Sequence, residues 1–114
     1  MNLQQITIEG RKEGHDYQLW CNGQHLDIAA SQRVRNHSQG FCWGYLGSGP
    51  AQSALAICLH VFGDRSHAEA LYQLFKEAYV ATWPIESSFR IELDLTDFVL
   101  DHARLLDETA TTKS

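Results

Sequence analysis

Apolar residues are densest in the middle of the 114-residue chain, where they predict a buried helix. From Ala51 to Phe62 nearly every position is apolar, and one face repeats at intervals of three and four residues. A helix that is apolar almost all round packs inside a domain rather than on its surface. Pro50 is expected at the first helical position, where its missing N–H costs nothing, and Gly63 is expected to end the helix in the left-handed conformation.

Alternating apolar and polar residues predict strands on both sides of this helix. The first two alternating segments flank a polar, glycine-containing connection at 10–14 and indicate an N-terminal β-hairpin. In the second of them Trp20 falls on the opposite face from Leu19, so an exposed indole there would suggest a protein contact. The region 26–34 fits either a short extended piece or a helical turn, and both remain open. The predicted strands are residues 3–9, 17–21, 41–45 and 89–93.

Two further helices are predicted after the buried one. Ser66 and Glu69 have the spacing of a capping box, in which each side chain satisfies a backbone donor near the other residue. The helix that they begin is expected to run to about Thr82. Either Asp94 or Thr96 would cap the last helix.

These elements predict an α+β fold in a single domain, residues 1–106. The expected architecture is a small antiparallel sheet, formed by the N-terminal hairpin and later strands and packed on two or three helices. The buried helix would lie at the centre. Residues 107–114 have nothing to bury and are expected to be disordered.

The charge balance limits the classes of partner. The net charge is −5, the isoelectric point is near 5.6, and the acidic residues concentrate between Glu86 and Glu108. A general nucleic-acid binder needs a basic face that releases counterions, so direct binding to nucleic acid is not expected. An acidic surface could meet a basic protein partner. The simpler interpretation is that the carboxylates only keep the protein in solution.

Segment lengths and cysteine usage favour a cytoplasmic protein. No apolar run approaches the length of a membrane span, and no basic-then-apolar signal peptide opens the chain. The three cysteines form no C-x-x-C pair and leave one thiol over, which fits reduced thiols better than a disulfide framework.

A glycine-rich turn before the buried helix carries the one feature with a chemical character. Gly44, Gly47 and Gly49 precede a helix N-terminus, where free N–H groups and the helix dipole favour an anion. A Walker loop would need lysine and Ser or Thr after its last glycine, whereas Pro50 and Ala51 stand there. The favoured interpretation is that the glycines form a turn and permit close packing. The candidate binding residues are Trp43, Tyr45, Gly47, Ser48, Gly49 and Gln52.

No other constellation indicates chemistry. Gln52 is expected to fix the loop through hydrogen bonds to backbone groups, and Ser48 to cap the helix. The six histidines show no metal-ligand spacing, and Cys58 and His60 lie on different faces of one helix. No catalytic residue, metal ligand or cofactor is therefore predicted.

The segment FCWGYLGSGPAQSALAI, the Phe75-Lys76 pair in the next helix and the segment LDLTDFV together resemble a small bacterial and phage family of unknown function. The hexapeptide GSGPAQ (residues 47–52) is the most specific part of the resemblance, which covers about residues 40–100. The resemblance implies the fold expected above and a source in bacteria or their mobile elements. It implies no activity.

The sequence thus predicts a non-catalytic protein-interaction module. A candidate role is the inhibition of a host defence complex, such as a CRISPR effector, whose basic nucleic-acid channel could accept carboxylates in place of phosphates. The alternative is a domain that binds a small ligand, a nucleotide or another anion at the glycine turn. The oligomeric state is left open.

Overall fold

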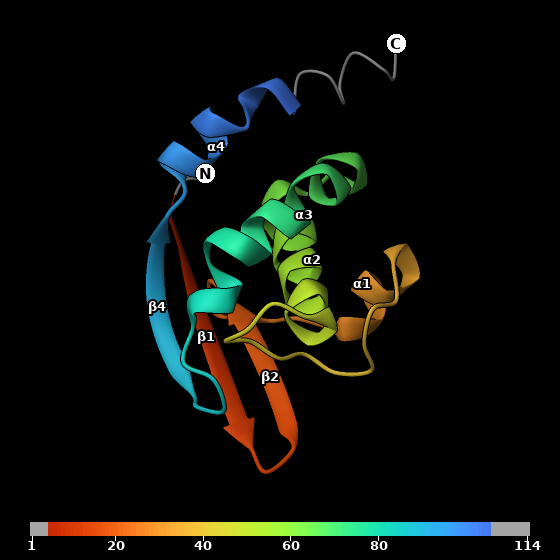
Figure 1. Cartoon of the computed structure of the whole chain (residues 1–114), viewed down its shortest axis with the longest axis vertical. Coiled ribbons are helices and arrows are strands. Elements are labelled where there is room, and N and C mark those ends of the chain that lie inside the picture. Colours follow the sequence, from red (N-terminus) through yellow and green to blue (C-terminus); the bar gives the residue numbers. More distant parts are fainter. Residues whose placement is uncertain (1–4, 106–114) are drawn as a thin grey trace.

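A computed structural model describes residues 5–105 and shows an α+β fold with helices packed on one face of an antiparallel sheet (Figure 1). The sheet order is β3-β2-β1-β4, and every neighbouring pair is antiparallel. The predicted fold class is confirmed. In chain order the elements are β1 (Gln5–Glu13), β2 (Asp16–Cys21), β3 (Gln24–His25), α1 (Ile28–Val34), α2 (Ser48–Phe62), α3 (Arg65–Ala78), the 3-10 helix η1 (Val80–Thr82), β4 (Phe89–Asp94) and α4 (Thr96–Asp101).

The strand alternation determines which face of the sheet meets the helices. Ile8 pairs with Cys21 on one side and with Ile91 on the other, and these side chains share the helical face. The adjacent row, Glu9 with Trp20 and Arg90, shares the opposite face. The predicted hairpin is present, but β1 continues through most of the expected connection 10–14.

The central helix α2 is buried as predicted. Most of its side chains are buried, and Gly63 ends it with φ 69° while its N–H donates to the Leu59 carbonyl at 3.0 Å. Pro50 is the third helical residue, not the first, because the helix begins at Ser48. Its missing N–H still belongs to the first turn, where backbone donors have no partner within the helix. Ser48 does not cap the helix, since Gly47 is the capping residue and makes no side-chain hydrogen bond.

The predicted strand 41–45 is wrong, because this segment is a loop docked on α2. The Cys42 N–H donates to Ser53 Oγ at 3.1 Å, and the same hydroxyl donates to the Cys42 carbonyl at 2.7 Å. A serine of the helix thus satisfies backbone groups that a strand would offer to a neighbour. Phe41 and Trp43 are buried on one side of the loop, which explains the alternation. For 26–34 the helical alternative is confirmed, as α1.

The later helices differ from prediction at their starts. Asp64 accepts a hydrogen bond from the His67 N–H at 3.1 Å and caps α3, so the Ser66–Glu69 capping box is wrong. Glu69 instead pairs with Arg65 one turn away, at 2.8 Å.

The helical stretch ends at Thr82, in η1, as predicted. At the start of α4, Asp94 Oδ1 accepts from the Thr96 N–H at 2.9 Å, but the capping position belongs to Leu95, which makes no side-chain hydrogen bond, so the prediction that Asp94 or Thr96 is the cap is wrong. Residues 3 and 4 of the first predicted strand and the predicted disordered segment 107–114 lie outside the described residues. Within 5–105, no helix combines the length and the apolar character needed to cross a bilayer.

Candidate functional site

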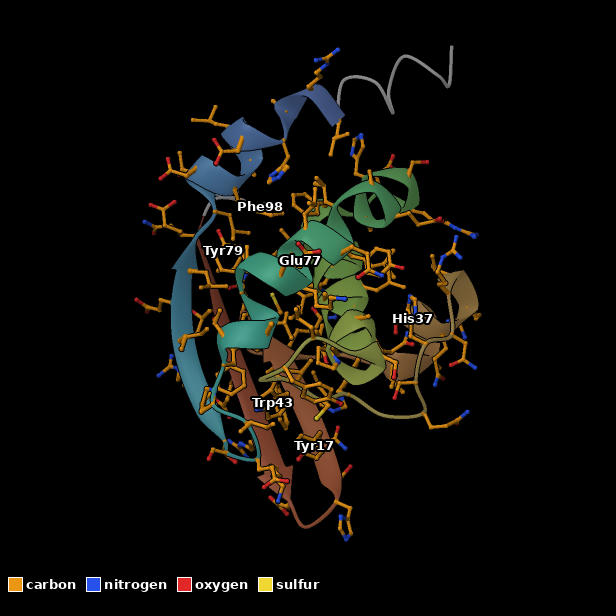
Figure 2. All side chains as sticks on the ribbon, in the orientation of Figure 1. Tyr17, His37, Trp43, Glu77, Tyr79 and Phe98 are labelled. Atoms are coloured by element: carbon orange, nitrogen blue, oxygen red, sulfur yellow. The ribbon has the colours of Figure 1, made fainter. Side chains whose placement is uncertain are left out.

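Trp43 anchors the glycine loop to the sheet. Its side chain is fully buried, and its indole N–H donates to the carbonyls of Pro84 (3.1 Å) and Ser87 (3.0 Å). The rings of Tyr17 and Phe89 meet it edge-on, each with centroids 5.0 Å away (Figure 2). Trp43 therefore fastens three segments together, and its surface is used within the protein.

The loop between η1 and β4, which contains Ile85, touches the glycine loop at Gly44. This residue has φ 92°, and a Cβ there would lie 2.6 Å from the Ile85 Cα. Its N–H donates to the Val80 carbonyl at 3.0 Å. Both the positive φ and the close approach require glycine. The two loops are thus held in direct contact although about forty residues separate them along the chain.

Three exposed apolar side chains gather where these loops meet. Tyr45 is 41% exposed, Leu46 is 66% exposed and Ile85 is 53% exposed. Close to them along the chain, Trp43 in the first loop and Trp83 at the start of the second loop are buried. We refer to Tyr45, Leu46 and Ile85 as the loop patch. Large apolar side chains that are exposed on neighbouring loops are typical of a contact site.

Gly47 and Gly49 are required for close packing and not for a positive φ. Gly47 is extended, with φ −175°, and Gly49 lies inside α2. A Cβ on Gly49 would lie 2.7 Å from the Cys42 Cβ, and one on Gly47 would lie 2.5 Å from Tyr45 Cε2. This agrees with the interpretation that the glycines form a turn and permit packing.

The phenol of Tyr45 lies back over the loop and does not extend freely into solvent. Partial burial raises its pKa, and hydrogen bonding to the neighbouring Cys42 raises it further. Tyr17 approaches the same thiol from the sheet, and its pKa is also raised, by desolvation first and then by Cys42. The loop patch therefore rests on a packed base of two phenols and a thiol.

Gln52 is fully buried, and its amide is fully engaged. Oε1 accepts from the N–H groups of His37 (2.7 Å) and Ser38 (3.1 Å). Nε2 donates to Ser31 Oγ (2.8 Å) and to the Arg35 carbonyl (3.1 Å). The expectation that Gln52 fixes the glycine turn is wrong, because its hydrogen bonds to backbone groups hold the loop 35–38 instead.

His37, in that same loop, should make stability depend on pH. Its Nε2 lies 2.7 Å from the Tyr72 hydroxyl (Figure 2). Desolvation lowers the pKa of His37 below its ordinary 6.5, and the charges of Arg35 and Lys76 lower it further. The unfolded chain therefore binds a proton at His37 more readily than the folded protein does. The stability that the neutral imidazole contributes is complete above the pKa of His37 in the unfolded chain and is lost as the pH falls below that value. We expect the free energy of unfolding to fall as the pH is lowered from neutrality through about 6.5.

The measurement is urea unfolding over a pH series. In the His37→Gln variant the fall should be smaller, whereas His15→Gln in the exposed hairpin turn should keep the wild-type slope. An identical slope in His37→Gln and in the wild-type protein would show that His37 does not cause the dependence.

The candidate residues thus separate into two groups. Tyr45 and Ser48 are exposed, and Gly47 lies beside them, whereas Trp43, Gly49 and Gln52 are buried. Sequence reasoning missed Leu46 and Ile85. A signal existed for Leu46, which is a large apolar residue between glycines, but Ile85 acquires its place only through the contact with Gly44.

A family model places the chain among known sequences. The model of the family of unknown function DUF6166 matches residues 8–102. The chain is a member of DUF6166. The expectation of a family of unknown function is thereby confirmed, and its coverage includes the N-terminal hairpin. No curated protein gives a match to this DUF6166 member, and no solved structure does either.

The metal-ligand residue types and the buried thiols of this DUF6166 protein can be followed in residues 5–105. Among residues 5–105 no three His, Cys, Asp or Glu side chains are arranged to hold a metal ion. Burial raises the pKa of Cys21 to about 11 and raises that of Cys58 well above its ordinary value. Thiols of this kind are poor nucleophiles, because the thiolate is the reactive form.

Proposed function

We propose that this DUF6166 protein is a non-catalytic protein-interaction module that binds its partner through the loop patch. The observation that carries the proposal is the exposure of Tyr45, Leu46 and Ile85 on two loops that Trp43 and Gly44 hold rigidly together. Loops that are already held in place lose little conformational entropy on binding, so that most of the free energy gained by burying their apolar side chains contributes to affinity.

The acidic charge supports a basic partner. Burial raises the pKa of Tyr79, and the negative charges of Asp97, Asp94 and Asp101, at the end of β4 and in α4, raise it further. A basic partner that binds the loop patch would be attracted by these carboxylates through longer-range electrostatics. The finer role that we propose is a cytoplasmic inhibitor from a bacterium or mobile element that blocks a basic nucleic-acid-binding effector of host defence.

The test is affinity capture with matched surface variants. Leu46→Arg should lose a stoichiometric protein that the tagged wild-type chain recovers from a bacterial lysate. Leu100→Arg should retain it, since Leu100 is equally exposed, at 68%, but lies on α4. Both variants should keep wild-type stability within about 0.5 kcal/mol, because exposed positions contribute little to folding. If the wild-type chain captures no protein, or if both variants retain the partner, the loop patch is not the binding site.

Anion binding at the start of α2 is the alternative function. It has less geometric support, because Gly49 and Pro50 are buried there. A thermal-shift panel of nucleotides and inorganic phosphate distinguishes the two. A bound ligand at a hundredfold excess over its dissociation constant would add about 2.7 kcal/mol of stability. A clear rise in melting temperature would favour the alternative.

A further inference from the structure

Strand β4 presents an unpaired edge that is regular along its whole length. Among residues 5–105 it is the outermost strand of the sheet and pairs with β1 alone (Figure 1). Its sequence, FRIELD, contains no proline or lysine, two residues that natural proteins use to protect such edges, and its charged residues Arg90, Glu92 and Asp94 carry both signs. The chain then turns into α4, where Phe98 packs on Phe75 and Tyr79 of the helical layer. Helix α4 therefore does not lie along the open edge.

The backbone groups that face outward can be assigned from the register. The Thr7 carbonyl accepts from the Asn22 N–H and the Thr7 N–H donates to Asn22 Oδ1, whereas the Lys12 N–H donates to Ser88 Oγ just before β4. The backbone groups of odd-numbered residues of β1 therefore face β2, and those of even-numbered residues face β4. Ile8 is opposite Ile91, so the odd-numbered residues of β4 bond to β1. The N–H and C=O groups of Arg90, Glu92 and Asp94 therefore point away from the sheet.

This edge is complementary to itself. In an antiparallel pair of two β4 strands related by a two-fold axis at Ile91, Arg90 lies opposite the second copy's Glu92, and Glu92 lies opposite its Arg90. Both members of each pair have outward-facing backbone groups, so the pairs also exchange main-chain hydrogen bonds. Within residues 5–105 neither Arg90 nor Glu92 forms an ion pair, so both charges are available.

The charges also select this register over its neighbours. Opposite residues must lie on the same face of the sheet, so the residue that faces any given position can change only by two at a time. A shift in one direction places Glu92 opposite Glu92 and Arg90 opposite Asp94, whose carboxylate already accepts two hydrogen bonds from Thr96 at the start of α4. A shift in the other direction places Arg90 opposite Arg90. Like charges directly opposite each other are destabilising. On the helical face the favoured register places Ile91 against Ile91 and Phe89 against Leu93, and all three are only half-buried in the single chain.

We propose that a second copy of this chain docks on β4, joining the two four-stranded sheets into one continuous sheet. The occupant is the chain itself, because one edge supplies the hydrogen-bond pattern, both charge pairs and the apolar contacts. Two-fold symmetry makes each contact occur twice. This surface is separate from the loop patch and does not depend on the proposed function.

The experiment is sedimentation equilibrium of the full chain from micromolar to millimolar concentration. The wild-type mass should rise from 12.9 kDa to twice that value. Arg90→Glu alone and Glu92→Arg alone should each weaken the dimer at least about tenfold, because each places like charges opposite each other twice. The double variant Arg90→Glu/Glu92→Arg restores opposite charges and should recover the wild-type dissociation constant. Arg33→Glu on exposed α1 is the charge-matched control and should change nothing.

A backbone variant tests the hydrogen bonds separately. Glu92→Pro removes an outward N–H and leaves every bond to β1 in place, so it should abolish the dimer while circular dichroism stays unchanged. Leu46→Arg should leave the dimer intact. A wild-type chain that stays monomeric throughout, or a double variant as weak as the single ones, would overturn the proposal. If Glu92→Pro fails to fold, the charge series alone decides.

Discussion

Trp43→Ala should lower the free energy of unfolding by about 3–5 kcal/mol, which is the range for removing a buried aromatic side chain. The loss has two sources in this structure. The cavity would open between Tyr17 and Phe89, and the carbonyls of Pro84 and Ser87 would lose their shared donor. Urea unfolding followed by far-ultraviolet circular dichroism measures the change.

Trp20→Ala is the matched control for this prediction. Trp20 lies on the open face of the sheet, where it contacts His25 and where the Arg11 guanidinium lies 5.0 Å from its ring centroid. Its removal should cost about 1 kcal/mol or less, since exposed cation–π contacts contribute little. Equal losses in the two variants would show that Trp43 does not have the anchoring role assigned to it.

Gln52→Met should lower the free energy of unfolding by about 2–4 kcal/mol, although it nearly preserves side-chain volume. The methionine cannot accept from the N–H groups of His37 and Ser38 or donate to the Arg35 carbonyl. Backbone groups left without a partner in a partly buried site account for the cost.

Amide hydrogen exchange adds a local readout for the same variant. The amides of His37 and Ser38 should exchange faster in Gln52→Met, whereas those of the α2 backbone should be less affected. Gln39→Met, at an exposed position in the same connection, should change neither stability nor exchange. Unchanged protection at His37 in the Gln52 variant would contradict the assignment of the hydrogen bonds.

The elements with strong local signals could be predicted from the sequence. Helix α2 follows from its apolar run, its end follows from Gly63, and the hairpin follows from alternation on both sides of a turn. These signals are local, since each depends on the spacing of near neighbours along the chain.

The errors occur where distant contacts override local pattern. FCWGY alternates like a strand, yet Ser53 supplies the hydrogen bonds that make it a loop. Ser66 and Glu69 have capping-box spacing, but Asp64 caps the helix two residues earlier by accepting from the His67 N–H. In the loop patch, Tyr45 belonged to the predicted site, whereas Ile85 joins it only because Gly44 admits its backbone. No periodicity within the chain encodes that contact.

The position of β1 at the centre of the sheet has a consequence for synthesis on the ribosome. One of its neighbours, β2, follows at once, but the other is β4, and Gln5 pairs with Asp94. In the nascent chain, one side of the hairpin therefore stays unpaired until the residues up to Asp94 have emerged. Pairings between such distant segments slow folding, and an open strand edge during that delay is a site of misassembly.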